Sequence, residues 1–164
     1  MKREGRKHEG RTPTTAYVAV GANLGDRAGN IRAAMDLLRA TDGIEVCRVS
    51  SLFENPALGG PIGASDFLNG AVEIRTTLDP LALLGAVQQI ERQLGRVRRE
   101  KWEPRIIDLD LLLFGGQVVN STHLTIPHPR MHERRFVLQP LAQIAPDVQH
   151  PTLRRSIASL LDAL

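Results

Sequence analysis

Two consecutive strand-like segments decide the fold of this chain: Ile44–Thr76 reads IEVCRVSSLFENPALGGPIGASDFLNGAVEIRT. The first segment, Ile44–Phe53, alternates loosely between apolar and polar residues, and the last, Phe67–Thr76, has the composition of a strand. Between them, Asn55–Ser65 is rich in Gly and Pro and has no periodicity, which predicts a long loop. Two strands with no helix between them argue against a doubly wound Rossmann domain, the main alternative.

The flanking segments give each half of the chain the order strand–helix–strand. Ala16–Gly25 predicts a buried strand that runs into a glycine turn, and Asp26 is the expected N-cap of a first helix. Pro80 is the expected first residue of a second helix, which Gly95 ends, and a fourth strand is expected within Ile106–Gly116. This order predicts an α+β fold, a ferredoxin-like sandwich with a mainly antiparallel sheet and helices packed on one face.

The part of the chain after this fourth strand is rich in prolines. Val118–Val119 predicts a short added strand, and five prolines from His123 to Pro151 predict mostly turns with one short helix. A terminal helix is expected over Ser156–Leu164.

Length and charge indicate one domain with a basic tail. The 164 residues are enough for a core without disulfides or a structural metal. Residues 1–13 hold five of the 21 Lys and Arg and two of the 18 Asp and Glu, so the other residues together carry no net charge. We therefore predict a flexible basic tail over residues 1–14 and a domain over residues 15–164, with no nucleic-acid partner for the domain.

The remaining composition excludes several classes of protein. A single cysteine, Cys47, rules out a disulfide framework and a cysteine-rich zinc site. No apolar run approaches the roughly 18–20 residues of a membrane span, so no membrane partner is expected. The charged amino terminus has no apolar stretch of the signal-peptide kind, which predicts a cytoplasmic location.

The fourth expected strand, in IIDLDLLLF, carries two aspartates, Asp108 and Asp110. Because side chains alternate along a strand, both carboxylates face one side, about 7 Å apart, together with Ile106, Leu112 and Phe114. In apolar surroundings two like charges repel each other and lose hydration, and a divalent cation offsets both effects. The pair therefore predicts a site for magnesium against phosphate oxygens, and a half-exposed strand with solvated carboxylates is the alternative.

A basic segment, RVRREKWEPR (Arg96–Arg105), precedes this strand. Arginine matches phosphate oxygens in a bidentate manner, so this segment beside two carboxylates predicts phosphoryl transfer. By itself, a run of charges is more often a solvated loop. The chain has no G-x-x-x-x-G-K-[ST] sequence, so an ATP site would have another architecture.

Three weaker signals lie elsewhere. Gln88 and Glu91 are spaced i, i+3 on the second expected helix, where an ordinary polar edge is the simpler interpretation. His128 is flanked by prolines, as in many surface turns. Phe67 and Asn69 share a strand face, so a heterocycle could stack on the ring and bond the amide, although core packing explains the ring equally well.

Taken together, four motifs resemble the 6-hydroxymethyl-7,8-dihydropterin pyrophosphokinases. They are VAVGANLGD near the start, DFLNGAV in the middle, KWEPRIIDLDLLLFG over Lys101–Gly115 and IPHPRMHERRFVLQPL later, in the family's order over about residues 16–150. The resemblance implies the ferredoxin-like fold and transfer of pyrophosphate from ATP to a pterin alcohol in folate biosynthesis, with AMP as the second product. It further implies ATP as co-substrate and two magnesium ions.

The resemblance also implies a role for each matching residue. The catalytic residues are Arg96, Arg105, Asp108 and Asp110, the two aspartates being the magnesium ligands. ATP is bound by Gln88, Glu91, Arg98, Lys101, Trp102, Arg105, Thr125, His128 and Arg134. The pterin is bound by Leu58, Phe67, Asn69 and Phe136.

Three residues depart from the family's pattern, and two other classes of function stay open on the residues alone. The departures are Lys101, Glu103 and Pro129. A metal-dependent nuclease or nucleotidyltransferase would use the aspartates and the basic segment but needs a basic groove. A non-catalytic RNA-binding module would need exposed aromatic residues on its central strands, where this chain has aspartates.

Overall fold

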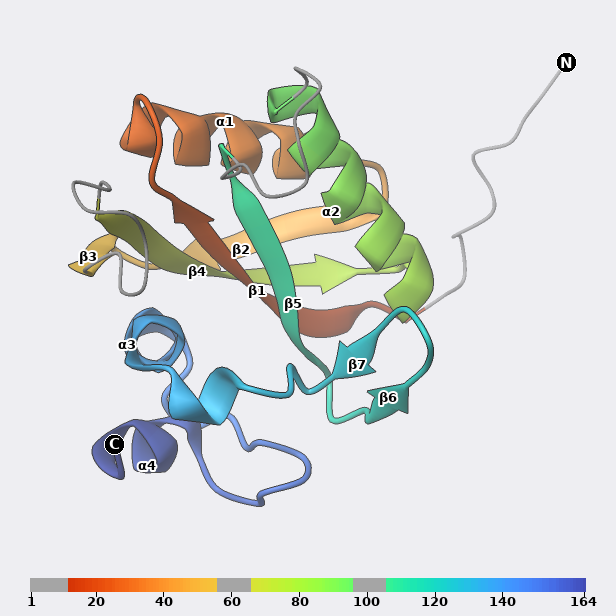
Figure 1. Ribbon diagram of the computed structural model, residues 1–164. Helices are drawn as coiled ribbons and strands as arrows, with labels where there is room; N and C mark the ends of the chain where they lie inside the picture. The colour runs from red at the N-terminus through yellow and green to blue at the C-terminus, as the bar shows by residue number, and fades with distance from the viewer. Residues whose placement is uncertain (1–11, 56–65, 96–105) are drawn as a thin grey trace, which may run out of the picture.

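The computed structural model describes residues 12–55, 66–95 and 106–164. In this part of the chain a sheet of order β2-β4-β1-β5, with β3 paired to β4, is antiparallel at every pairing (Figure 1). Its strands are β1 (Thr14–Ala22), β2 (Ile44–Val49), β3 (Phe53–Asn55), β4 (Phe67–Thr76) and β5 (Asp108–Phe114). The order confirms the ferredoxin-like arrangement predicted from the sequence.

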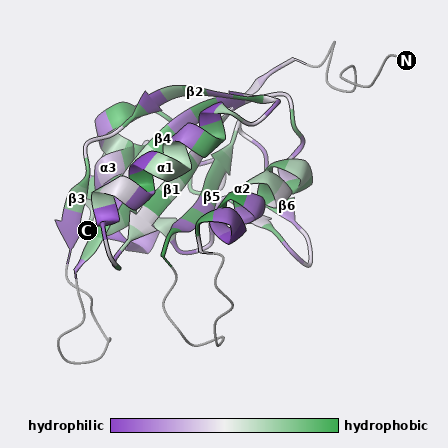
Figure 2. Cartoon of the chain, turned by 90° about the horizontal axis from the view of Figure 1, so that it is seen from above, coloured by the Kyte–Doolittle hydropathy of each residue, from purple (hydrophilic) through white to green (hydrophobic). Residues whose placement is uncertain are grey.

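One face of the sheet is covered by α1 (Arg27–Arg39) and α2 (Pro80–Leu94). The predicted cap of α1 is confirmed, since the side chain of Asp26 accepts the backbone N–H of Gly29. Asp79 caps α2 in the same way, immediately before Pro80. Figure 2 shows that both helices mix hydrophilic and hydrophobic residues, as expected when one side of a helix packs on a sheet. The core on this side includes Val18, Val20, Leu38, Ile74, Leu83, Val87 and Leu111.

The opposite face is covered by α3 (Arg135–Ile144), which packs on β4 and on α4 (Ile157–Asp162) (Figure 1). The prediction that helices pack on one face is confirmed for α1 and α2. It did not include α3 and α4 on the opposite face. The second core includes Tyr17, Leu112, Met131, Leu138, Leu141 and Ile157. The short elements between β5 and α3 are β6 (Val119–Asn120), β7 (Thr125–Ile126) and η2 (Met131–Glu133).

The segment predicted as one strand over residues 44–53 is two strands with a break between them. At the break, the hydroxyl oxygen of Ser50 accepts the backbone N–H of Ala71 at 2.9 Å. The backbone N–H of Ser51 donates to Gln143 Oε1 at 2.6 Å, and Arg48 donates to the carbonyl of Ile144 at 2.9 Å. The break therefore joins the sheet to the C-terminal end of α3.

β5 contains an irregularity that the alternation rule missed. Leu111 pairs with Val18, but Leu113 pairs with Tyr17, so one extra residue, Leu112, lies in β5. Leu112 packs in the core under α3, as predicted from its position in phase with the aspartates, whereas Phe114 packs in the core under α1 and α2. The prediction that Phe114 faces the same side as the aspartates is wrong, because the bulge reverses the alternation after it.

Two further sequence expectations concern the N-terminal tail and membrane-spanning helices. Residues 1–11 of the predicted tail lie outside the described residues, and β1 begins at Thr14. Over residues 12–55, 66–95 and 106–164, none of the helices has the length and apolar character needed to cross a membrane.

Candidate active site

A cavity of about 350 Å³ opens between the sheet and the N-terminal end of α3. It brings together six of the residues predicted from the sequence, from three separate parts of the chain. These six are Phe67, Asn69, Asp108, Asp110, Arg134 and Phe136; Ala19, Val20, Gly21, Asn55 and Val137 complete the lining. Polar acceptors, aromatic rings and carboxylates thus line one space.

A row of paired residues across three strands forms the floor of this cavity. Gly21 of β1 pairs with Asp108 of β5 on one side and with Asn69 of β4 on the other. A Cβ atom placed on Gly21 would lie 2.7 Å from Asn69 Nδ2, closer than side chains tolerate. The missing side chain at this position leaves the space between the amide and the carboxylate open.

Two buried amide oxygens in the cavity have no hydrogen-bond donor among the described residues: Asn55 Oδ1 and Asn69 Oδ1. An unpaired buried acceptor costs about 1–3 kcal/mol, a cost that a ligand N–H can remove. Asn69 was predicted as a ligand contact, and Asn55 was missed because the sequence places it at the start of a loop. The structure reveals Asn55 through its pairing with Phe67. Paired residues share a face of the sheet, so Asn55 lies on the same face as Phe67 and Asn69.

Arg134 and Phe136 meet at the start of α3, on the side of the cavity opposite the sheet. The guanidinium carbon of Arg134 lies 5.6 Å from the centroid of the Phe136 ring, within the range of a cation–π contact. Phe136 keeps 38% of its surface exposed, so part of its ring is open to contact from a ligand in the cavity.

A second cavity, of about 310 Å³, adjoins the first at Asp110, which lines both. It contains two further predicted residues, Thr125 and His128, and one residue of α2 that the sequence did not indicate, Leu84. Thr125 and His128 of the predicted ATP set therefore line one space and the predicted pterin residues another, and the two spaces share Asp110. Arg134, also predicted for ATP, lines the first cavity instead.

The ring of His128 has a defined orientation. Its Nδ1 accepts the backbone N–H of Arg130 at 3.2 Å, which assigns the proton to Nε2. Burial lowers the pKa of His128 below its ordinary value; Asp110 opposes this shift, and the cations of Arg134 and Arg130 add to it. Nε2 is thus a hydrogen-bond donor of a residue that lines the second cavity.

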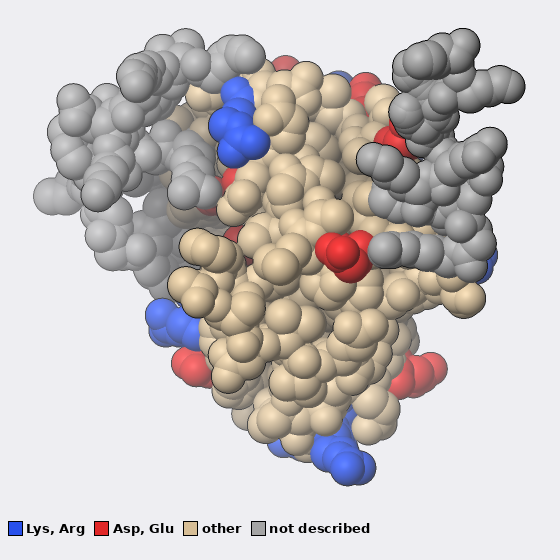
Figure 3. Space-filling model, turned by 90° about the vertical axis from the view of Figure 1, so that its right-hand side faces the viewer, with Lys and Arg blue, Asp and Glu red and all other residues tan. Residues whose placement is uncertain are grey.

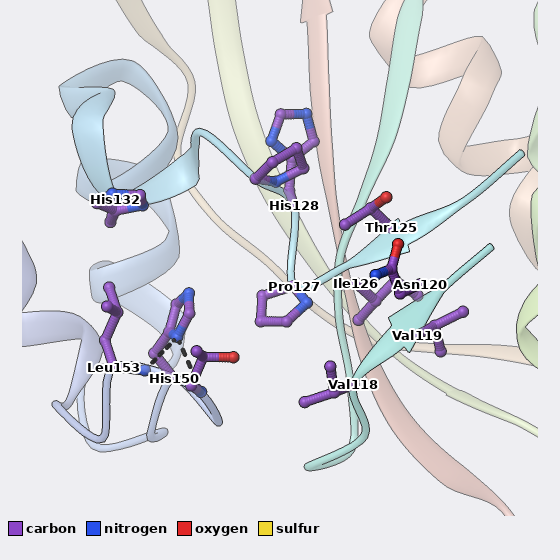
Figure 4. Close-up of a pocket in the computed structure, with 12 residues that line it drawn as sticks. Val118, Val119, Asn120, Thr125, Ile126, Pro127, His128, His132, His150 and Leu153 are labelled. Atoms are coloured by element: carbon purple, nitrogen blue, oxygen red, sulfur yellow. Dashed lines mark hydrogen bonds between the residues drawn. The ribbon is translucent and has the colours of Figure 1, made fainter. Parts of the chain in front are cut away.

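His128 also borders a third cavity, of about 280 Å³, on the other side of β7 (Figure 4). His150 lines it and is buried, and its Nδ1 accepts the backbone N–H groups of Thr152 at 3.2 Å and Leu153 at 3.0 Å. The ring of His132 meets that of His150 edge to face, with centroids 6.3 Å apart. Phe67, Asn69 and Phe136, the predicted pterin residues that the structure describes, do not line this cavity.

Gln88 and Glu91, the two predicted ATP contacts of α2, line neither of the first two cavities. Gln88 is exposed on α2. Glu91 Oε2 accepts the backbone N–H of Leu109 at 2.8 Å, so this carboxylate bonds to the strand between the two aspartates.

Comparison with known proteins identifies a family whose range includes the first two cavities. The family model of 7,8-dihydro-6-hydroxymethylpterin-pyrophosphokinase matches residues 17–146, which include all the cavity residues named above except those around His150. The chain belongs to this family. The family predicted from the sequence is thereby confirmed, and with it the class of enzyme, a pyrophosphokinase of folate biosynthesis.

Curated relatives of this pyrophosphokinase are similar over most of their length. The 2-amino-4-hydroxy-6-hydroxymethyldihydropteridine pyrophosphokinase of Bacillus subtilis is 47% identical over 137 residues, 82% of this chain and 80% of the relative. The protein of that name from Synechocystis is 43% identical over 90% of this chain and 74% of the relative.

Solved structures share the fold at low identity. The crystal structure of wild-type Plasmodium falciparum HPPK-DHPS with pteroate superposes with a TM-score of 0.73 at 16% identity. It covers 94% of this pyrophosphokinase, which spans 45% of that chain.

Several residues that the resemblance assigns in the pyrophosphokinase lie outside the described residues. They are Leu58, Arg96, Arg98, Lys101, Trp102 and Arg105. Their roles stay predictions.

The carboxylates of the pyrophosphokinase fit magnesium in their number and chemistry. Among the residues that the structure describes, no group of three or more His, Cys, Asp or Glu could hold a metal ion. Magnesium does not need such a cage, since it is commonly held by one or two carboxylates together with substrate phosphates. Asp108 and Asp110 provide those two carboxylates in the cavity.

Proposed function

We propose that this chain transfers pyrophosphate from ATP to the hydroxymethyl group of 6-hydroxymethyl-7,8-dihydropterin, giving the pterin diphosphate and AMP. The observation that carries the proposal is one cavity in which two aspartates lie beside two phenylalanines and two amide oxygens that have no donor among the described residues. A flat heterocycle rich in N–H donors, carrying an alcohol that receives phosphate, requires this combination.

The pterin would occupy the part of the cavity between the sheet and α3. Asn55 and Asn69 have oxygens ready to accept from its N–H groups, and Phe67 and Phe136 offer ring faces for stacking. Leu58 completes this half of the site in our proposal. Buried amides that are unpaired without ligand discriminate strongly against a compound that lacks the matching donors.

ATP would lie on the side of Thr125 and His128. The Nε2–H group of His128 donates to a phosphate oxygen, and Arg134 contributes a cation near the point where the two cavities meet. The residues that would hold magnesium, two ions by the family resemblance, are Asp108 and Asp110. Bound magnesium supplies neutralisation of the phosphate charge as it develops.

Transfer itself depends on orientation. The pterin hydroxymethyl oxygen attacks the β-phosphorus of ATP and releases its proton to solvent, the bond from that phosphorus to the α–β bridging oxygen breaks, and AMP leaves with this oxygen. Because Asp110 lines both cavities, alcohol and triphosphate meet beside it. We assign no general base, since alignment and charge stabilisation account for most catalysis of this kind. Arg96 and Arg105 are the proposed cations on the transferred group.

Two alternatives lack comparable support. On the face shown in Figure 3, the basic side chains of the described residues are scattered and alternate with acidic ones. A nuclease or an RNA-binding module on this fold would also leave the unpaired amides of the cavity without a role. A cytoplasmic location stays a prediction.

The test is release of AMP from ATP by the purified chain, with and without the pterin alcohol, in magnesium buffer. We expect AMP only when the pterin is present, and loss of the reaction when EDTA removes divalent cations. AMP release without pterin, or salt-dependent binding of oligonucleotides with no AMP release, would contradict the proposal.

A further inference from the structure

Arg27, the first residue of α1, joins two parts of the chain that border the pterin half of the cavity. Its Nη2 donates to Glu54 Oε1 at 2.6 Å, and its Nη1 donates to the carbonyl oxygen of Asp66 at 2.9 Å. The side chain is 27% exposed. One guanidinium therefore holds a residue of β3 and the residue before β4 at the same time.

Each partner of Arg27 is a chain neighbour of a cavity residue. Glu54 precedes Asn55 and Asp66 precedes Phe67, and those two neighbours pair with each other across β3 and β4. Side chains alternate along a strand, so Glu54 faces α1 while Asn55 faces the cavity. Arg27 thus acts from the opposite side of the sheet and is absent from the cavity lining.

β3 is a short strand, whose other support comes from contacts with α3 and from the bonds of Ser50 and Ser51 before it. It is three residues long, and in the described sheet it pairs with β4 alone. So short a pairing has few backbone bonds, and the charge-assisted bond to Glu54 of β3, together with the bond to the carbonyl of Asp66 before β4, adds to them.

Stability of α1 does not account for a cation at this position. A positive charge in the first turn of a helix is unfavourable, because the helix dipole is positive there. Asp26 already caps the helix. The hydrogen bonds to Glu54 and Asp66 also use two different nitrogens of the planar guanidinium group, whereas a lysine has one nitrogen for both acceptors.

We propose that Arg27 is a positioning residue for the pterin half of the site: it clamps β3 to the start of β4 and so sets the distance between Asn55 and Phe67. The inference rests on the proposed function for the identity of the ligand. The clamp itself rests only on the two hydrogen bonds of Arg27 and the strand pairing.

The test compares Arg27→Met with Arg39→Met. The second variant removes an exposed arginine of the same helix. Nη1 of Arg39 lies 3.6 Å from Oδ1 of Asp36. We expect Arg27→Met to weaken binding of 6-hydroxymethylpterin about 10-fold, measured by calorimetry with a saturating non-hydrolysable ATP analogue, and to leave affinity for that analogue unchanged. Arg27→Lys should restore part of the loss, and Arg39→Met should bind both ligands normally.

Amide hydrogen exchange separates the clamp from the identity of the ligand. In ligand-free Arg27→Met, we expect about 10-fold faster exchange for the amides of β3 and the first residues of β4, with α3 unchanged. Unchanged exchange at β3, or equal weakening of both ligands, overturns the positioning role. If the unmodified chain binds no pterin while exchange at β3 responds as expected, the proposed function fails and the clamp stands.

Discussion

Glu91 of α2 accepts the backbone N–H of Leu109, the residue between Asp108 and Asp110, at 2.8 Å. β5 ends the described sheet, so its outer edge has no strand to receive this N–H. Leu109 is 4% exposed, and a buried donor without a partner would be costly. The carboxylate therefore stabilises the strand at the point where both proposed magnesium ligands originate.

Removing this acceptor should affect both stability and rate. We expect Glu91→Ala to lower the free energy of unfolding by about 1–3 kcal/mol and to reduce turnover, because it leaves the Leu109 N–H unpaired beside both aspartates. Glu91→Gln keeps an acceptor oxygen and should recover most of the stability. Urea unfolding and AMP release measure the two effects, with exposed Gln93→Ala of the same helix as control. Normal stability of Glu91→Ala would show that the bond contributes little.

Asp110 should be essential for transfer and dispensable for folding. Its side chain is exposed and lines both cavities, so Asp110→Asn leaves the fold intact while removing a charge from the proposed magnesium site. We expect turnover to fall about 100-fold or more, with an unchanged melting temperature. Asp147→Asn, at an exposed position away from both cavities, serves as control. Near-normal activity at saturating magnesium would contradict the assignment.

The two halves of the site should respond separately to substitution. We expect Asn69→Ala and Phe136→Ala each to weaken pterin binding by about 1–3 kcal/mol, because one removes a bonded edge and the other a stacking face. Affinity for a non-hydrolysable ATP analogue should hardly change. Calorimetry with each ligand in turn decides this, and equal losses for both ligands would count against separate pockets.

A single methyl group at Gly21 should damage the pterin pocket without unfolding the protein. The new Cβ would lie 2.7 Å from Asn69 Nδ2, at the end of a side chain that can rotate away. We expect Gly21→Ala to weaken pterin binding about as much as Asn69→Ala, while ATP-analogue affinity is kept. Gly85→Ala, where a Cβ meets nothing within 4 Å, is the matched control. Full pterin affinity in Gly21→Ala would mean that the amide is not a ligand contact.

His150 should make the protein less stable as the pH falls. Burial, and then the neighbouring His132, lower its pKa below the ordinary value of 6.5, and protonating Nδ1 would break its bonds to Thr152 and Leu153. The unfolded chain then binds more protons than the native state at pH values between the lowered pKa and 6.5. The contribution of His150 is complete above pH 6.5 and is lost as the pH falls through the lowered native pKa.

Substitution of His150 should therefore flatten the pH dependence of stability. We expect the free energy of unfolding of His150→Gln to change less between pH 7 and pH 5 than that of the unmodified chain, by urea unfolding at each pH. His128 has a pKa shifted in the same direction, so part of the dependence persists. Exposed His123→Gln should keep the original slope. An identical slope in His150→Gln would refute the account.

The features that local sequence determines were predicted correctly. Asp26 and Pro80 mark the starts of α1 and α2, because capping and proline geometry act within one helical turn. Asp108 and Asp110 share a cavity, because a two-residue spacing needs only local strand alternation. The motif around them was sufficient to indicate the family.

The features that only the tertiary structure decided depend on contacts between distant parts of the chain. The bulge at Leu112 sends Phe114 to the opposite core, and the register of β3 on β4 places Asn55 in the cavity. Glu91 bonds to β5, 18 residues further along the chain. Alternation and periodicity describe one segment at a time, whereas pairing register and the partner of a buried polar atom are set by which segments meet when the core closes.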